Sequence, residues 1–167
     1  MSGQRLELKS KQVGQIAHAL RQIGIVEGIP KEAGRLVGVA ALDMVTRGFE
    51  NESDPYGRKW KPQRRRPGGQ TLSDTGRLKN SWRVSVTDKS VKLVNATRYA
   101  AIHQYGGTIR PVKAKALRFK LGDAWVTTKK VTIPQRMMVP TSGPSPSWED
   151  AFIEEIAAWL ESQEAMQ

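Results

Sequence analysis

The sequence predicts an α+β fold, in which an antiparallel β-sheet with a long hairpin packs against an N-terminal helical hairpin and a C-terminal helix. Apolar residues recur at helical spacing near both ends of the chain, and two stretches between them alternate between apolar and polar residues. The elements follow the order helix, helix, loop, helix, two strands, helix, two strands, helix, which is typical of an antiparallel sheet. At 167 residues, we expect a single domain spanning residues 1–167.

Residues 1–50 are expected to form the helical hairpin. Ser10 can cap a first helix that ends before two glycines, and Pro30 suits the first turn of a second helix, where a missing N–H costs nothing. Gly34 and Gly38 lie four residues apart on the second helix, so another backbone can approach there. The apolar face of this helix comprises Leu36, Val37, Ala40, Ala41, Met44, Val45 and Phe49. The short link between the helices favours antiparallel packing.

A basic loop over residues 51–72 and an α+β core over residues 73–146 follow. The loop has no periodicity and contains three prolines. In the core, Ser73 or Asp74 can cap a short helix that ends near Trp82. The alternating stretches RVSVTD and VKLVN then predict a first β-hairpin with its turn at residues 88–90.

The second half of the core is predicted to hold a short helix and a longer hairpin. Thr97 can cap the helix, which ends before Gly106. Residues 108–133 are basic and rich in strand-forming residues, with a turn expected at residues 121–123. Ser147 can cap the final helix, over residues 147–167, whose first turn carries acidic residues where the helix dipole favours them.

Charge is distributed unevenly along the chain, which has a net charge of +11. Residues 57–83 carry nine basic residues and one acidic residue, and residues 84–136 carry eleven and two. Residues 137–167 carry no basic residue and six acidic ones. This asymmetry suggests nucleic acid or a matched protein partner, or head-to-tail binding between copies. One hypothesis is that the acidic last helix meets the basic 108–133 hairpin of a neighbour.

Composition excludes several classes of protein. The chain has no cysteine, so a disulfide framework and a thiolate metal site are excluded. The N-terminus lacks the apolar core of a signal peptide, and no apolar run approaches the roughly 20 residues of a membrane span. We therefore expect a soluble protein made in the cytoplasm, with no membrane partner. The apolar fraction of 38% is low, so some apolar surface is expected to be buried only against partners.

The stretch RYAAIHQYGG, residues 98–107, raises the question of catalysis because it holds His103. A general base needs an orienting partner and a nucleophile or water, and the middle of the chain has few carboxylates and no second nearby histidine. Gly106 and Gly107 follow a helix, whereas phosphate-binding glycines precede one. Gly106 is therefore interpreted as a helix C-cap in the left-handed region. We expect no enzyme activity, no catalytic residue, no cofactor and no metal; the other histidine, His18, is expected to face solvent.

The basic loop has two interpretations. Arg64, Arg65 and Arg66, beside the aromatic Tyr56 and Trp60, can bind phosphates and stack on bases. A solvated mobile loop has the same composition.

The five tryptophans are better explained as core or interface anchors. Trp82, Trp148 and Trp159 fall at apolar helix positions. Trp60 and Trp125 lie in loop or hairpin contexts and are the stronger interface candidates.

Four motifs in the right order resemble the phage virion morphogenesis family. They are F-x5-PYGRKW from Phe49, LSDTGRLKNSW from Leu72, RYAAIHQYGGTI from Arg98, and IPQRMMVP from Ile133. The resemblance runs from about residue 35 to the final helix. The family commonly carries a Pro-Phe-like pair after the IP-x-R turn, where this chain has Met137 and Met138, whereas the turn itself is kept.

The resemblance implies a structural protein of virion assembly, at the head-proximal end of the tail or in the neck, that is needed for head–tail joining. It implies that the chain forms a ring with itself, sixfold by tail symmetry, and binds the tail tube or terminator and the neck or connector proteins. It also implies location in the virion. Alternatives are a tail terminator or head–tail connector ring subunit and, from another class, a basic nucleic-acid-binding module that transiently contacts DNA in the lumen.

Tyr99, His103 and Gln104 are expected to lock their short helix against the DTGRL segment, residues 74–78. The full set of interface or structural-motif candidates is Trp60, Asp74, Gly76, Tyr99, His103, Gln104, Gly106, Gly107, Pro134 and Arg136.

Overall fold

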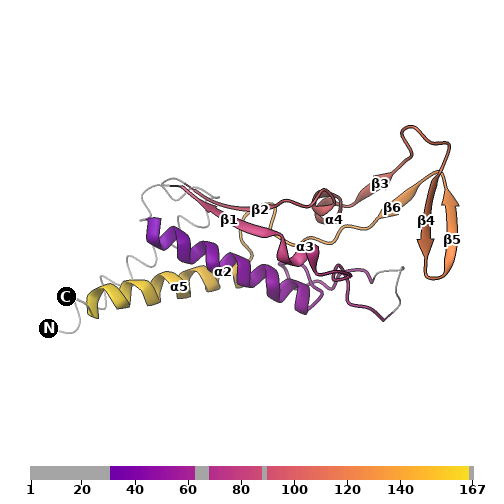
Figure 1. The fold of residues 1–167 in the computed structure, drawn as a ribbon. Coiled ribbons are helices and arrows are strands. Elements are labelled where there is room, and N and C mark those ends of the chain that lie inside the picture. The colour runs from indigo at the N-terminus through magenta and orange to yellow at the C-terminus, as the bar shows by residue number, and fades with distance from the viewer. Residues whose placement is uncertain (1–30, 63–67, 88–89, 166–167) are drawn as a thin grey trace. The chain divides into compact units, whose positions relative to one another are not determined.

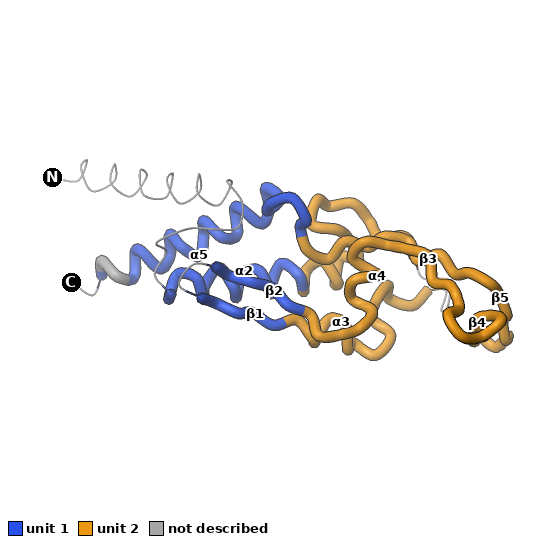
Figure 2. Tube along the Cα trace, turned by 90° about the horizontal axis from the view of Figure 1, so that it is seen from above, with its two compact units in different colours: residues 1–45, 83–94, 140–167 blue, residues 46–82, 95–139 orange. Residues whose placement is uncertain are grey.

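The computed structural model describes residues 31–62, 68–87 and 90–165, and confirms the α+β class (Figure 1). The expected first helix after Ser10, His18, the three arginines at 64–66 and most of the expected turn at 88–90 lie outside these residues. The described part divides into two compact units, coloured separately in Figure 2. The first contains residues 31–45, 83–94 and 140–165, and the second contains residues 46–82 and 95–139.

In the first unit, helix α2 packs against a β-hairpin. Helix α2, Lys31–Glu50, continues into the second unit. The hairpin consists of β1, Trp82–Val86, and β2, Val91–Asn95, which pair with each other. The α2 backbone approaches β1 so closely that a Cβ atom added at Gly38 would overlap Cγ1 of Val84. The two helix glycines therefore serve the close approach that their spacing predicts.

Helix α5, Pro146–Ala165, also lies in the first unit and buries one apolar face. Trp148, Phe152 and Ile156 are buried at four-residue spacing, and the first two rings meet edge to face with centroids 6.0 Å apart. The expected cap at Ser147 is wrong by two positions. The carbonyl of Ser145 accepts hydrogen bonds from the amides of residues 148 and 149, and Pro146 takes the first helical position.

The second unit holds two short helices, α3, Arg77–Asn80, and α4, Ala100–Tyr105. Neither expected side-chain cap is present. Gly76, with φ 68°, precedes α3, and Tyr99 precedes α4, each without a side-chain cap hydrogen bond. The hydroxyl of Thr97 donates to the side-chain oxygen of Asn95 at 2.7 Å instead.

The long hairpin of the second unit forms two separate ladders. Strands β3, Gly107–Ile109, and β6, Val131–Ile133, pair near its base, and β4, Leu117–Leu121, and β5, Ala124–Thr128, pair at its end. The turn falls at Gly122 and Asp123, as predicted. Seven residues separate β3 from β4 but only two separate β5 from β6, so the ladders cannot share one register. No helix among the described residues is long and apolar enough to cross a bilayer.

Candidate functional site

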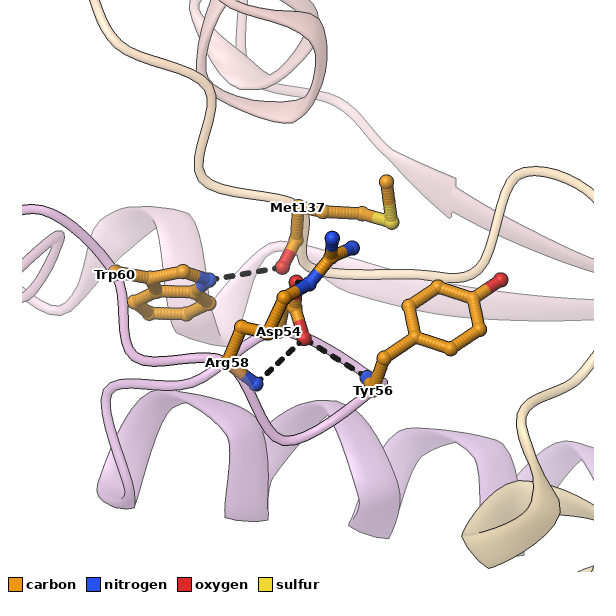
Figure 3. A network of polar contacts seen from close by, with 5 residues as sticks. All are labelled: Asp54, Tyr56, Arg58, Trp60 and Met137. Carbon is orange, nitrogen blue, oxygen red and sulfur yellow. Dashed lines mark hydrogen bonds and ion pairs between the residues drawn. The ribbon is translucent and has the colours of Figure 1, made fainter.

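The PYGRKW motif forms a tight turn organised by Asp54. Its carboxylate accepts hydrogen bonds from the amides of Tyr56 and Arg58, each at 2.9 Å, and from Nε of Arg58 at 2.8 Å (Figure 3). Gly57 takes φ 82° at the tip. Asp54 thereby stabilises the turn through local hydrogen bonds. After the turn the chain runs back toward the end of α2, where the amide of Trp60 donates to the carbonyl of Glu52.

Trp60 leaves this turn and is buried in the second unit rather than exposed. Its ring lies edge to face against Phe49, with centroids 5.3 Å apart. Its indole Nε1 donates a hydrogen bond of 2.9 Å to the carbonyl of Met137 (Figure 3). Of the two tryptophans expected at interfaces, only Trp125 is largely exposed, at 62%. Trp60 joins the first motif to the last.

Arg136 is the second buried link between these motifs. Its Nε donates to the carbonyl of Lys61 at 2.7 Å and its Nη2 to the carbonyl of Pro62 at 3.1 Å. Its own amide donates to the carbonyl of His103 at 2.7 Å. Burial lowers the pKa of this guanidinium, which still carries its charge at neutral pH. The residue that sequence reasoning singled out in the IP-x-R turn thus joins the loop at 61–62 to α4.

Gln104 in α4 is buried and holds the chain after Arg136. Its Oε1 accepts hydrogen bonds from the amides of Met138 at 2.8 Å and Val139 at 3.2 Å, and its Nε2 donates to the carbonyl of Val139 at 2.6 Å. The expectation that Gln104 locks α4 against the DTGRL segment is therefore wrong. An amide side chain can both donate and accept, so it pairs with both the amide and carbonyl groups of the backbone at residues 138–139.

His103 is half-buried. Its Nδ1 is buried and has no hydrogen-bond partner among the described residues. Desolvation, together with the nearby charge of Arg136, lowers the pKa of the imidazole, so the ring is neutral at pH 7. The ring of Tyr99 meets it edge to face at 6.1 Å. The histidine therefore contacts an aromatic ring and lies within the electrostatic influence of a cation.

Gly106 ends α4 in a conformation that differs from the expected left-handed cap. Its φ of 72° is positive, but its ψ of 177° places it in a region that is open essentially to glycine alone. A Cβ atom there would lie 2.8 Å from the amide nitrogen of Gln135. The chain passes straight from this residue into β3, where Gly107 pairs with Ile133, so no further turn of left-handed structure forms.

The LSDTGRLKNSW motif and the residue before it are held by hydrogen bonds to distant segments of the second unit. The amide of Thr71 donates to a carboxylate oxygen of Glu52 at 3.0 Å, and its hydroxyl and amide bonds lower the pKa of that carboxyl. The side-chain amide of Asn95 donates to the carbonyl of Leu78 at 2.9 Å. Asp74 itself is exposed. Residues of all four motifs lie within the second unit.

These motif residues border a groove of about 1370 Å³ in the second unit, which we call the arm groove. One part of its lining comes from the motifs, including Tyr99, His103, Asp74 and Pro134, and the other from the β4–β5 hairpin. The apolar residues of the lining are Leu72, Leu78, Phe119, Leu121, Val126, Val131 and Ile133, and its basic residues are Lys61, Arg77, Lys120, Lys130 and Arg136.

Sequence reasoning missed Glu52, Asp54 and the groove. The DPYG sequence is itself a turn signal that could have identified Asp54, because aspartate accepts hydrogen bonds from its own backbone two residues on. Glu52 adopts φ 49° and pairs with a residue 19 positions away. The groove depends on segments more than 60 residues apart, and no local pattern marks it.

The chain matches the model of the phage virion morphogenesis family over residues 9–161. No curated protein and no solved structure gives a significant match to the chain.

Proposed function

The chain belongs to the phage virion morphogenesis family, and from that premise we propose that it is a tail-completion protein needed to join tails to DNA-filled heads. Membership of the family assigns it to phage virion assembly and to the virion. We place it at the head-proximal end of the tail or in the neck. There it acts as a structural subunit in a ring of copies, sixfold by tail symmetry, without enzyme activity.

The observation that carries this proposal is the use of the four motifs as internal scaffolding. The polar side-chain atoms of Trp60, Gln104 and Arg136 bond to backbone carbonyls and amides of segments far away in the chain. Each of these buried contacts ties together segments at least 34 residues apart. Buried side chains that bond to distant backbone groups hold the fold of the second unit in one conformation. This suits a structural protein that acts by binding partners through its surface.

The surface that the scaffold presents is the basic hairpin. Residues 107–133 carry seven basic residues and one acidic residue. On its outer face, the guanidinium of Arg118 lies 4.8 Å from the centre of the exposed ring of Trp125. Exposed arginine and tryptophan side chains are the residue types that contribute most at protein interfaces. This supports binding to a tail-tube, terminator or connector protein, with DNA in the lumen as a transient contact.

A phage that carries an early stop codon in this gene tests the proposal. Negative-stain electron microscopy of the lysate should show separate filled heads and separate tails of normal length. Tails of uncontrolled length would identify a tail terminator instead. Intact, infectious virions would remove the assembly role and favour the basic nucleic-acid-binding alternative.

A further inference from the structure

The arm groove combines an apolar lining with unpaired cations. Among its apolar lining residues, Phe119 and Val126 are half-buried and pair across the β4–β5 ladder, so both point into the groove from one face of the hairpin. Lys61 and Lys130 also line it, are exposed, and form no ion pair with any described residue. A two-stranded hairpin is marginal in water unless its apolar face is covered. The groove therefore favours an occupant that is both amphipathic and acidic.

The size of the groove fits about three turns of helix. An α-helix about 10 Å across rises about 1.5 Å per residue, so eleven residues fill roughly 1,300 Å³. The groove measures about 1370 Å³.

Helix α5 offers an acidic segment with two small apolar residues on its outer face. Its 20 residues include six acidic residues and no basic one. Asp150, Glu154 and Glu161 are exposed, and their spacings of four and seven residues put them on one face of the helix. Ala157 and Ala158 lie between them, so the helix backbone can approach a partner closely along this face. We call these five residues the acidic face of α5.

We propose that the arm groove binds the acidic face of α5 from a second copy of this chain. The contact is heterologous, because two different surfaces meet, and repetition of such a contact closes a ring when the rotation allows it. The acidic carboxylates pair with Lys61 and Lys130, and the hairpin gains cover for Phe119 and Val126. The inference rests on the proposed assembly role, which it deepens by naming the partner and the two faces.

Charge argues against two other occupants. The chain's own residues 1–30 carry four basic and two acidic residues, so they would be repelled by the lysines of the groove. A nucleic acid satisfies the lysines, but its phosphates cannot cover the apolar lining, and Asp74 would face them.

Cysteine cross-linking tests the contact directly, because the natural chain has no cysteine. The full chain is made as Ala158→Cys and, separately, as Leu121→Cys, which lies in the groove lining and is 38% exposed. The two proteins are mixed and oxidised, and the heterodimer is followed on a non-reducing gel. Val94→Cys, on β2 outside the groove and 51% exposed, is the matched control for Leu121→Cys.

The expected result is a heterodimer of the 158 and 121 variants that forms at least tenfold faster than that of the 158 and 94 variants. Adding Glu154→Lys and Glu161→Lys to the helix variant should remove this advantage, and adding Lys61→Glu and Lys130→Glu to the groove variant should restore it. Circular dichroism of each variant verifies folding.

Three outcomes overturn the proposal. They are equal cross-linking to the two sites, no cross-linking, and binding of a short duplex oligonucleotide to the groove lysines that prevents the heterodimer at both sites equally. The assay needs only purified chain, so it separates this inference from the proposed function. Absence of the heterodimer alongside normal head–tail joining removes the contact alone, whereas a heterodimer with failed joining removes the joining role alone.

Discussion

Replacing Gln104 with leucine should strongly destabilise the second unit. The two side chains are similar in size, so the change removes hydrogen bonds with little change in packing volume. The amide of Met138 is buried with its residue at 2% exposure, and in the native chain it donates to Gln104 at 2.8 Å. In the variant, this amide and the polar groups of Val139 lose their side-chain partner.

The magnitude follows from these three groups. A buried donor or acceptor without a partner costs about 1–3 kcal/mol. Met138 bears that cost in full, whereas half-buried Val139 can recover part of it from water. Leucine returns some free energy through its apolar surface. The net loss in free energy of unfolding is about 2–4 kcal/mol, which lowers the melting temperature of a chain of this size by roughly 5–15 °C.

Urea unfolding followed by tryptophan fluorescence measures this loss. Gln135→Leu is the matched control, because it makes the same chemical change at an exposed neighbouring position and should alter stability by less than about 0.5 kcal/mol. A Gln104→Leu variant as stable as the Gln135→Leu variant would refute the assignment of Gln104 as the link to residues 138–139.

Three further predictions concern stability. Gly38→Ala should lower the free energy of unfolding by about 1–2 kcal/mol despite the better helix propensity of alanine, because the new Cβ collides with Val84. A double-mutant cycle with Val84→Ala should show coupling between the two changes, and additive effects would contradict the close approach. Trp60→Phe should lower the free energy of unfolding in urea by about 1–2 kcal/mol, because the Met137 carbonyl loses its hydrogen-bond donor while the ring contact with Phe49 remains. An unchanged urea midpoint would contradict this hydrogen bond. Burial lowers the pKa of His103, so the unfolded chain binds a proton at this residue more readily than the folded chain does. Stability should therefore fall as pH drops below about 6.5. His103→Gln should flatten this pH dependence in unfolding curves from pH 7.5 to pH 5, and an unchanged dependence would contradict the burial of the imidazole.

The elements with strong local patterns were predictable from the sequence. Helix α2 follows from Pro30 and an apolar face that the structure buries at Val37, Ala41 and Val45. The β4–β5 hairpin follows from alternation through Phe119 and a turn at residues 122–123. In these places the local preference and the tertiary fold agree, so the pattern is sufficient.

The contacts of the site were not predictable in the same way. The partners of Gln104 lie 34 and 35 residues away, and those of Arg136 lie 74 and 75 residues away. Sequence position identified both residues, but their hydrogen-bond partners are backbone groups, which carry no side-chain signature. The predicted helix caps at Thr97 and Ser147 were wrong, and each hydroxyl instead forms a hydrogen bond with a side chain two residues away, that of Asn95 or of Ser145.

The central claim is that this protein joins tails to filled heads, and joining in vitro tests it most directly. Filled heads and tails are isolated from the stop-codon phage and mixed with the purified wild-type chain, and infectious particles are counted as plaques. The account predicts that the chain restores infectivity to the mixture, and that Gln104→Leu protein incubated above its melting temperature does not. Mixtures that stay non-infectious with folded wild-type chain, or that are already infectious without it, would contradict the account.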